Sequence, residues 1–234
     1  MRRPELSPRL RMVGDLVPAG ARLADVGTDH AYLPAALILE EKIPWAVAAD
    51  LRRGPLDRAR ATVRDCGLTG RVAFRLCDGL TGIRPDEVDA VAIAGMGGET
   101  IAAILSAAPW IREEGVPLIL QPMSSMSDLR DWLRNNGFRI EEERLAREGD
   151  MIYTALLVRA GEMGPLTPAE LWAGRNSGDP LRGAWLDQWL ARTCRALAGM
   201  AQAQGEGVLA RRRVLEEVRD GLSDMKKEWE QWQL

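Results

Sequence analysis

The stretch from Leu23 to Pro34, LADVGTDHAYLP, constrains the fold more than any other part of this chain. It begins with apolar residues, as does a strand that is covered on both faces, and Gly27 then permits a sharp turn because it has no Cβ. We expect Thr28 or Asp29 to cap the helix that follows. Such a turn in an α/β sheet is where nucleotide-like ligands bind, although a β-turn without a ligand has the same pattern.

The charge of this turn narrows the class of ligand. The turn has one glycine in place of the G-x-G-x-x-G pattern of dinucleotide-binding proteins, which argues against a dehydrogenase. Asp25 and Asp29 would repel a pyrophosphate, because both side chains are negative at neutral pH. S-adenosylmethionine (SAM) carries a sulfonium cation and no phosphate, so the stretch favours SAM as the ligand.

Up to about residue 160, apolar strands alternate with helices, and this alternation predicts a mostly parallel sheet. The expected strands are 23–26, 45–49, 71–77, 88–94, 117–120, 138–145 and 151–158. The expected helices are 8–17, 35–41, 56–66, 100–108 and 124–135. The last two strands are close enough in sequence to form a hairpin. A parallel sheet closed by a hairpin is the usual architecture of methyltransferases, so the predicted fold class is α/β and Rossmann-like.

Polar or small residues follow three of the later strands. Asp50 ends the second strand, where a carboxylate can accept both ribose hydroxyls, and Leu51 beside it is included in the predicted site. Asp78 and Gly79 follow the third strand, where an acid can accept the amine of an adenine. The run from Gly95 to Gly98 (GMGG) allows a ligand to approach bare backbone. The alternatives are an acid that simply ends a strand and a tight turn without a ligand.

Composition excludes several classes of protein. The net charge of −3 over 234 residues does not suit a generic nucleic-acid coat, although local basic patches remain possible. The three cysteines have no metal-binding spacing and indicate reduced thiols in a cytoplasm. The N-terminus has arginines but no apolar run, so neither a signal peptide nor a membrane span is expected. The arginines of the first helix, Arg9 and Arg11 among them, form a solvated face or contact phosphates.

A change of pattern after residue 160 predicts a second domain. Residues 161–180 are rich in glycine and proline, and two heptad patterns follow, which predict an antiparallel helical hairpin. We therefore divide the chain into 1–160, the ligand-binding domain, and 161–234, a helical coiled-coil domain. Arg211, Arg212 and Arg213 lie near the tip of the hairpin. The hairpin is either a structural tail or dimer handle, or an arm that grips a polyanion, and the chain is a monomer or a homodimer.

Three motifs in this order, LADVGTDHAYLP, AIAGMGG and LILQP, resemble those of the bacterial tRNA (adenine-N1)-methyltransferases that modify adenine 22 of tRNA. The resemblance runs from about Leu6 to about Val158, and the heptad hairpin is similar in pattern to the C-terminal coiled coil of that family. It implies a class I SAM-dependent methyltransferase domain with a seven-stranded sheet. It also implies SAM as cofactor, tRNA as partner, and methyl transfer to N1 of an adenine.

The resemblance also implies roles for individual residues. The methionine part of SAM would be held by Asp25, Gly27, Thr28, Asp29 and His30, with Gly95, Met96, Gly97 and Gly98 lining the site. Asp50 would hold the ribose, and Asp78 and Gly79 would lie beside the adenine. Tyr32 would stack on the incoming base and Gln121 would bond its amine, as the catalytic pair. The alternatives are a core aromatic for Tyr32 and a hydrogen bonder that shapes the turn for His30.

Two departures from the family pattern affect the substrate side of the site. Met123 stands where the family has asparagine, and a methionine cannot donate a hydrogen bond to a base. Thr154 replaces an acid. Two further hypotheses therefore stay open. One is a SAM-dependent methyltransferase that acts on another RNA or on a small molecule, and the other is a non-catalytic homologue that binds SAM or tRNA.

Overall fold

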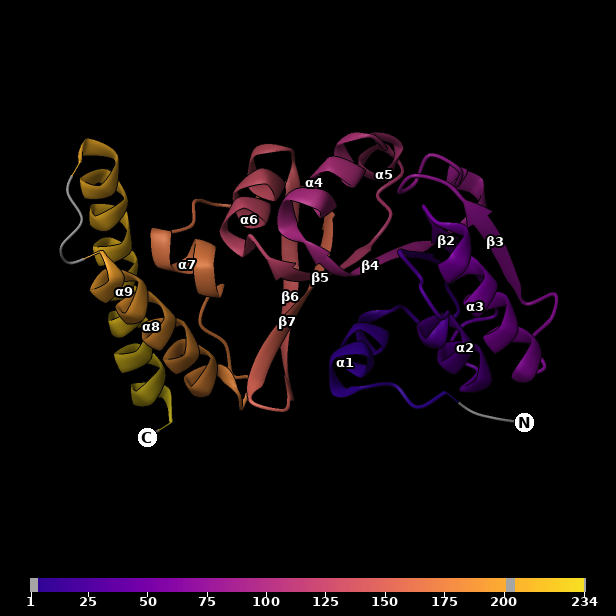
Figure 1. Cartoon of the computed structure of the whole chain (residues 1–234), viewed down its shortest axis with the longest axis horizontal. Helices are drawn as coiled ribbons and strands as arrows, with labels where there is room; N and C mark the ends of the chain where they lie inside the picture. The colour runs from indigo at the N-terminus through magenta and orange to yellow at the C-terminus, as the bar shows by residue number, and fades with distance from the viewer. Residues whose placement is uncertain (1–3, 201–204, 234) are drawn as a thin grey trace.

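The computed structural model describes residues 4–200 and 205–233, and its centre is a seven-stranded sheet (Figure 1). The strands are β1 (Arg22–Val26), β2 (Trp45–Asp50), β3 (Val72–Leu76), β4 (Ala90–Gly97), β5 (Leu118–Ser124), β6 (Phe138–Glu148) and β7 (Met151–Ala160). Their order across the sheet is β3-β2-β1-β4-β5-β7-β6. The first five strands pair in parallel, and β7 runs antiparallel to both β5 and β6. The predicted sheet, with its closing hairpin, is confirmed.

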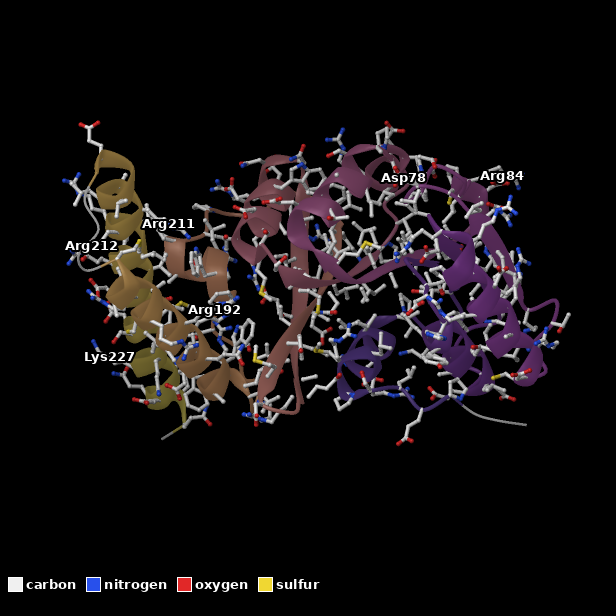
Figure 2. The ribbon with its side chains drawn as sticks, in the orientation of Figure 1. Asp78, Arg84, Arg192, Arg211, Arg212 and Lys227 are labelled. Carbon is white, nitrogen blue, oxygen red and sulfur yellow. The ribbon has the colours of Figure 1, made fainter. Side chains whose placement is uncertain are left out.

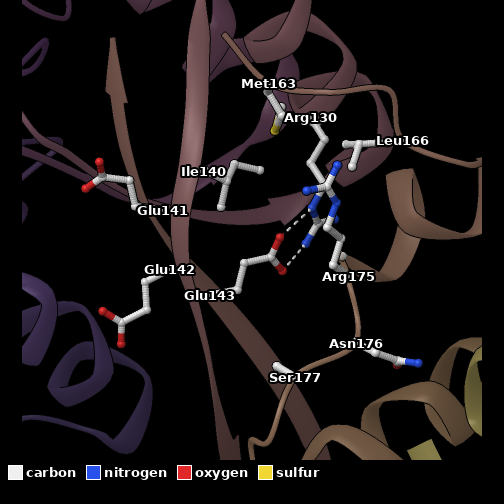
Figure 3. Close-up of a pocket in the computed structure, with 11 residues that line it drawn as sticks. Arg130, Ile140, Glu141, Glu142, Glu143, Met163, Leu166, Arg175, Asn176 and Ser177 are labelled. Atoms are coloured by element: carbon white, nitrogen blue, oxygen red, sulfur yellow. Dashed lines mark hydrogen bonds and ion pairs between the residues drawn. The ribbon is translucent and has the colours of Figure 1, made fainter. Parts of the chain in front are cut away.

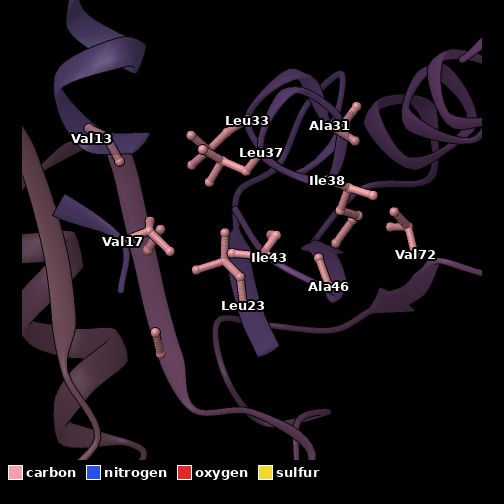
Figure 4. Packing of buried hydrophobic residues seen from close by; sticks show 14 of the residues in the cluster. Val13, Val17, Leu23, Ala31, Leu33, Leu37, Ile38, Ile43, Ala46 and Val72 are labelled. Carbon is pink, nitrogen blue, oxygen red and sulfur yellow. The ribbon is translucent and has the colours of Figure 1, made fainter. Parts of the chain in front are cut away.

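Helices cover both faces of this sheet. They are α1 (Pro8–Leu16), α2 (Tyr32–Leu39), α3 (Arg53–Asp65), α4 (Gly98–Ser106), α5 (Trp110–Glu113) and α6 (Met126–Asn135). Side chains of α1, α2 and α3 pack on one face in a cluster that includes Val13, Leu23 and Leu37 (Figure 4). Side chains of α4, α5 and α6 pack on the other face, around Ile93, Ile101 and Leu129. The parallel strands are therefore buried on both faces, which explains why they are continuously apolar in the sequence.

The boundaries of several elements differ from the prediction. Neither Thr28 nor Asp29 caps α2: its N-cap is Ala31, in a left-handed conformation with φ of 54° and no side-chain hydrogen bond. Strand β4 continues through Gly97 and β5 through Ser124, because these two residues pair across the strands. Gly95 to Gly97 and the Gln121–Pro122 motif are thus strand backbone at the carboxyl end of the sheet, whereas the predicted strands ended at residues 94 and 120.

The C-terminal part comprises α7 (Pro168–Ala173), α8 (Arg182–Gly199) and α9 (Glu206–Trp232). Helices α8 and α9 pack together as the predicted antiparallel hairpin, with Gly183 against Trp229 and Asp187 paired with Lys226. Because α9 is longer, its first turns extend beyond the end of α8 (Figure 1). Helix α7, which the sequence did not predict, lies between this hairpin and the sheet.

Two buried arginines join α7 to its neighbours. Arg130 of α6 donates to the carbonyl oxygens of Leu171 and Trp172 at 3.0 and 3.1 Å, and it forms a two-pronged pair with Glu143 of β6 (Figure 3). Arg182 of α8 donates to the carbonyl oxygens of Ala173 and Gly174 at 2.5 and 2.6 Å. Burial lowers the pKa of Arg182 to about 10. Both cations therefore satisfy the free carbonyl groups at the C-terminus of α7.

The division after residue 160 stays a prediction. A third apolar cluster combines Met126 and Ile152 with Trp185, Leu186 and residues of α9, so it draws on both sides of that boundary. Within the two described ranges, no helix has the length and apolar character needed to cross a membrane.

Candidate functional site

A cleft of about 760 Å³ lies at the carboxyl ends of β1, β2, β3 and β4. Eight of the predicted site residues line it: Gly27, Asp29, Asp50, Leu51, Asp78, Gly79, Gly95 and Met96. The parallel strands explain this convergence, because their carboxyl ends meet at one edge of the sheet. Seven predicted residues lie outside the lining: Asp25, Thr28, His30, Gly97, Gly98, Tyr32 and Gln121. Most of the residues predicted to hold the cofactor therefore lie together, while both predicted catalytic residues, Tyr32 and Gln121, lie outside the lining.

The turn after β1 is held in an unusual backbone conformation. Gly27, Asp29 and Ala31 have φ values of 74°, 44° and 54°, a region that costs energy for residues other than glycine. The positive φ of Gly27 favours glycine, and a Cβ there would also displace the Met96 methyl group, which lies 2.2 Å from the added atom. The Gly27 and Thr28 N–H groups both donate to the Ala49 carbonyl at 2.8 and 3.0 Å. The turn is thus fixed against β2 and β4.

Asp25 lies behind this turn rather than in the cleft. The Thr28 hydroxyl donates to its carboxylate at 2.6 Å, which explains why Thr28 does not cap α2. Burial raises the pKa of Asp25 to about 6; the Thr28 hydrogen bond opposes this shift, and the negative charge of Asp50 adds to it. These two residues therefore shape the turn from behind.

The side of the cleft nearest β2 and β3 carries two carboxylates. Asp50 is 8% exposed, and its Oδ1 accepts the Arg52 N–H at 2.9 Å, which fixes the direction of the carboxylate. Asp78 is exposed at the end of β3. Leu51, which is 64% exposed, adds an apolar surface between them. This combination suits a ligand with hydroxyl or amine donors and a flat apolar ring.

One wall of the cleft was missed by the sequence analysis. It is formed by residues of α4 and its C-cap at positions i, i+3, i+4 and i+7: Thr100, Ala103, Ile104 and Ala107. The Ile104 side chain lies over Gly79, where a Cβ would be only 2.9 Å away. A signal was present, because this small and apolar stripe adjoins the buried stripe of Ile101 and Leu105 and widens the apolar face of the helix. A helix with two apolar stripes has more apolar surface than the core needs.

Two arginines line the same cleft. Arg58 of α3 forms an ion pair with Asp29, and Arg52 follows the end of β2. The pair with Asp29 balances one of the three carboxylates in the lining, so Asp50 and Asp78 carry the remaining negative charge.

Tyr32 and His30 form an exposed aromatic stack beside this cleft. Their ring centroids are 5.0 Å apart with an angle of 12° between the planes. Tyr32 is 41% exposed, so the alternative of a core aromatic is wrong. Both residues line a second cavity of about 560 Å³, and Arg58 lines both this cavity and the cleft. The stack is therefore a neighbour of the cleft and is not part of its lining.

Gln121 has a different position from the one expected of a substrate-binding residue. It is 0% exposed, and its Oε1 accepts hydrogen bonds from Arg9 Nη1 at 2.7 Å and from the Gly95 N–H at 3.1 Å. Its Nε2 donates to the Pro122 carbonyl at 2.9 Å and faces the Met123 sulfur at 3.6 Å. Because both ends of the amide are engaged, Gln121 cannot bond the amine of a base without giving up these contacts. The prediction that it does so is revised on this ground.

The residues of the cleft fit SAM. Its volume holds a nucleoside-sized molecule. Asp50 and Asp78 stand at the ends of adjacent strands, where they match ribose hydroxyls and an adenine amine. The bare backbone at Gly27 and Gly95 permits close approach. The negative lining tolerates a sulfonium cation, whereas it would repel the phosphates of a dinucleotide.

Comparisons with known proteins agree with this geometry. Residues 6–156 match the family described as "Methyltransferase domain". The chain is 38% identical over 158 residues to the tRNA (adenine(22)-N(1))-methyltransferase of Bacillus subtilis, which covers 68% of this chain and 66% of that protein. In sequence, the chain spans 60–66% of the length of the curated relatives it matches.

The likeness to solved structures extends over nearly the whole chain. The crystal structure of the B. subtilis m1A22 tRNA methyltransferase TrmK has a TM-score of 0.81 at 30% identity, and covers 95% of this chain and 99% of that one. A Streptococcus pneumoniae relative solved in complex with SAM has a TM-score of 0.79 at 32% identity, with 95% and 100% covered. The chain belongs to the methyltransferase-domain family and, within it, to the TrmK-like tRNA m1A22 methyltransferases.

Proposed function

We propose that this protein transfers a methyl group from SAM to N1 of adenine 22 in tRNA. The observation that carries the proposal is the cleft itself. It combines Asp50 and Asp78 at neighbouring strand ends with bare backbone at Gly27 and Gly95, in a chain that is 38% identical to a methyltransferase of that specificity. A tRNA-modifying enzyme works where tRNA is found, so we place the protein in the cytoplasm.

Within the cleft we assign SAM an orientation. Asp50 holds the ribose hydroxyls, because two hydroxyl donors on one carboxylate form charge-assisted hydrogen bonds. Asp78 and Gly79 lie beside the adenine, between Leu51 and the Ile104 stripe. The methionine part lies along the turn from Gly27 to His30 and the β4 end from Gly95 to Gly97. Asp25 and Thr28 act from behind by fixing the turn.

Methyl transfer to adenine N1 needs little general acid or base catalysis from the protein. Bound SAM supplies an electrophilic methyl group on a sulfonium. Adenine N1 has a free lone pair, so no side chain needs to remove a proton before transfer. The residues of the chain therefore align the two reactants and exclude water from between them. A base at the surface of the cleft must first leave its stack, and the exposed Tyr32–His30 pair offers it an aromatic face.

The helical hairpin supplies a second surface for the RNA. Five arginines are exposed toward its free end: Arg192, Arg195, Arg211, Arg212 and Arg213. Figure 2 shows Arg192, Arg211 and Arg212 on the hairpin in the left part of the view, and Asp78 right of centre. A basic cluster so far from the cleft suits a long polyanion, and tRNA is one.

A methyl-transfer assay tests the proposal. We expect label from radioactive SAM to enter unmodified tRNA, and mass spectrometry to place it at N1 of adenine 22. Label in another RNA or in small metabolites would support the alternative that Met123 suggests, since its exposed thioether replaces an amide. SAM binding without turnover on any of these substrates would support a non-catalytic homologue.

The cofactor site is tested with Asp50→Ala. This variant should weaken SAM binding by about 1–3 kcal/mol in calorimetry, the scale of hydrogen bonds to a charged group. Asp86→Ala is the matched control, because Asp86 is exposed outside the cleft and its carboxylate pairs with Arg84. Equal SAM affinity in both variants would remove Asp50 from the site.

A further inference from the structure

We propose that Arg9 binds a backbone phosphate of the RNA at the edge of the cofactor cleft, and that Gln121 is the positioning residue that holds Arg9 there. This inference rests on the proposed function, because it names a contact with the RNA substrate. It replaces the direct contact between Gln121 and the base that the sequence suggested.

Arg9 lies beside the cofactor cleft. Its Nη1 atom is 2.7 Å from the Gln121 Oε1 atom, which also accepts the Gly95 N–H at 3.1 Å. Gly95 lines the cleft, and a Cβ added to it would lie 3.6 Å from Arg9 Nη1. One amide therefore ties the guanidinium to a lining residue of the cleft.

The guanidinium of Arg9 is hydrogen-bonded to a neutral side chain. In residues 4–200 and 205–233, no carboxylate oxygen lies within 4 Å of its guanidinium, and its hydrogen-bonded partner is a neutral amide. Arg11, two residues further along α1, is paired with Glu40 and Asp15. The Glu148 carboxylate, whose pKa the charge of Arg9 helps to lower, makes no ion pair with the guanidinium, so the guanidinium keeps the capacity to bind an anion directly. Four of its five N–H donors remain for an anion.

Several contacts hold Arg9 in place. Its backbone N–H donates to the Glu148 carboxylate at 3.2 Å, and its guanidinium lies 5.8 Å from the centre of the Tyr153 ring. The Ser7 hydrogen bond and the Arg9 N–H hold the pKa of Glu148 below its usual value. Residues of α1, β4, β5, β6 and β7 thus converge on one half-buried arginine. Because these contacts already order the side chain, Arg9 loses little further conformational entropy when it binds an anion.

The position of Arg9 favours a phosphate of the RNA over the carboxylate of SAM as its anion. The cations in the cleft lining are Arg52 and Arg58, while Arg9 lies outside it on the other side of Gly95. Arg52 and Arg58 are therefore the cations available to the carboxylate of SAM within the lining. A phosphate beside a base that enters the cleft would approach from the side where Arg9 stands. Planar guanidinium groups bind phosphate oxygens in pairs, which gives orientation as well as affinity.

The experiment measures tRNA binding as a function of salt, together with SAM binding and kcat/KM. Arg9→Gln should weaken tRNA binding about tenfold and reduce the slope of log affinity against log salt by about 1, with SAM affinity unchanged. Arg9→Lys should keep the salt slope but not the full kcat/KM, because the fork geometry is lost. Arg11→Gln is the control and should change neither quantity, since that arginine is already paired.

Gln121→Glu tests the positioning role. It should neutralise Arg9 in place and reproduce the loss of salt slope, and in the double variant with Arg9→Gln the two losses should not add. Loss of SAM affinity in Arg9→Gln, or an unchanged salt slope, would overturn the inference. Binding needs no turnover, so absence of methyl transfer by the native protein would count against the proposed function and leave this test intact.

Discussion

Asp25 is a carboxylate in a position that is costly for a charge. It is buried behind the cofactor turn, and its pKa is raised from 3.8 to about 6, mainly by burial. Between these two values the folded protein binds more protons than the unfolded chain, so stability falls as pH rises through this window. Asp25 therefore lowers the free energy of unfolding at neutral pH, and in return it holds Thr28 and fixes the turn.

Asp25→Asn should therefore stabilise the SAM-free protein at pH 7–8 by about 2–3 kcal/mol, on the basis of 1.36 kcal/mol for each pKa unit. The gain should shrink as the pH falls from 6 toward 4, where the native carboxyl group becomes protonated. Urea unfolding of both proteins across this range measures it. Thr28→Val removes the hydroxyl donor, so it should move the window to higher pH. A gain that is constant with pH would contradict the assignment.

At the residue level, the sequence predicts those site residues that stand at the ends of parallel strands. Asp50 and Asp78 were found because parallel strands end at one edge of the sheet. The bond between Arg9 and Gln121 could not be found this way, because its partners are 112 residues apart and leave no local pattern. The Ile104 stripe could have been found, since its periodicity is visible in α4.

Elements were predicted better than their ends. The apolar runs and the glycine turns between them locate all seven strands, because a short apolar run bounded by turn residues is typical of a buried strand. The ends depend on neighbours: β4 and β5 continue because Gly97 pairs with Ser124. The start of α2 was misplaced because Thr28 bonds Asp25, and the chain reaches the helix through a left-handed alanine.

The close approach of α4 and α6 gives a prediction at this scale. A Cβ on Gly98 would lie 2.2 Å from the Ser125 carbonyl oxygen, which is backbone and cannot move aside cheaply. Gly98→Ala should therefore lower the free energy of unfolding by about 1–3 kcal/mol, the range for an overpacked core. Gly178→Ala is the control, because nothing lies within 4 Å of its added Cβ. Equal stability of the two variants would show that the helices can separate without cost.

For the whole molecule, the question is what the hairpin contributes. Removing it would uncover Met126 and Ile152, which pack against Trp185 and Leu186, so a truncation would test folding and RNA binding together. Substitutions at the exposed end separate the two effects.

Arg211→Gln with Arg213→Gln should lower tRNA affinity and reduce its salt dependence by up to about 2 in slope, while SAM affinity stays the same. Arg84→Gln is the control, because Arg84 is exposed near the opposite end of the molecule (Figure 2) and is paired with Asp86. Filter binding over a range of salt concentrations measures both. Unchanged tRNA affinity would favour a structural tail or a dimer handle, and the mass of the native protein in solution would then decide between them.

The two buried arginines at the end of α7 have a consequence for how an RNA is chosen. Because Arg130 and Arg182 grip the same short helix from the sheet side and from the hairpin side, the hairpin is not hinged freely to the sheet. Under the proposed function, the distance between the cofactor cleft and the basic tip of the hairpin is therefore fixed. A nucleic acid that rests on both must present its adenine at a matching distance, so three-dimensional shape would screen molecules before base identity is read.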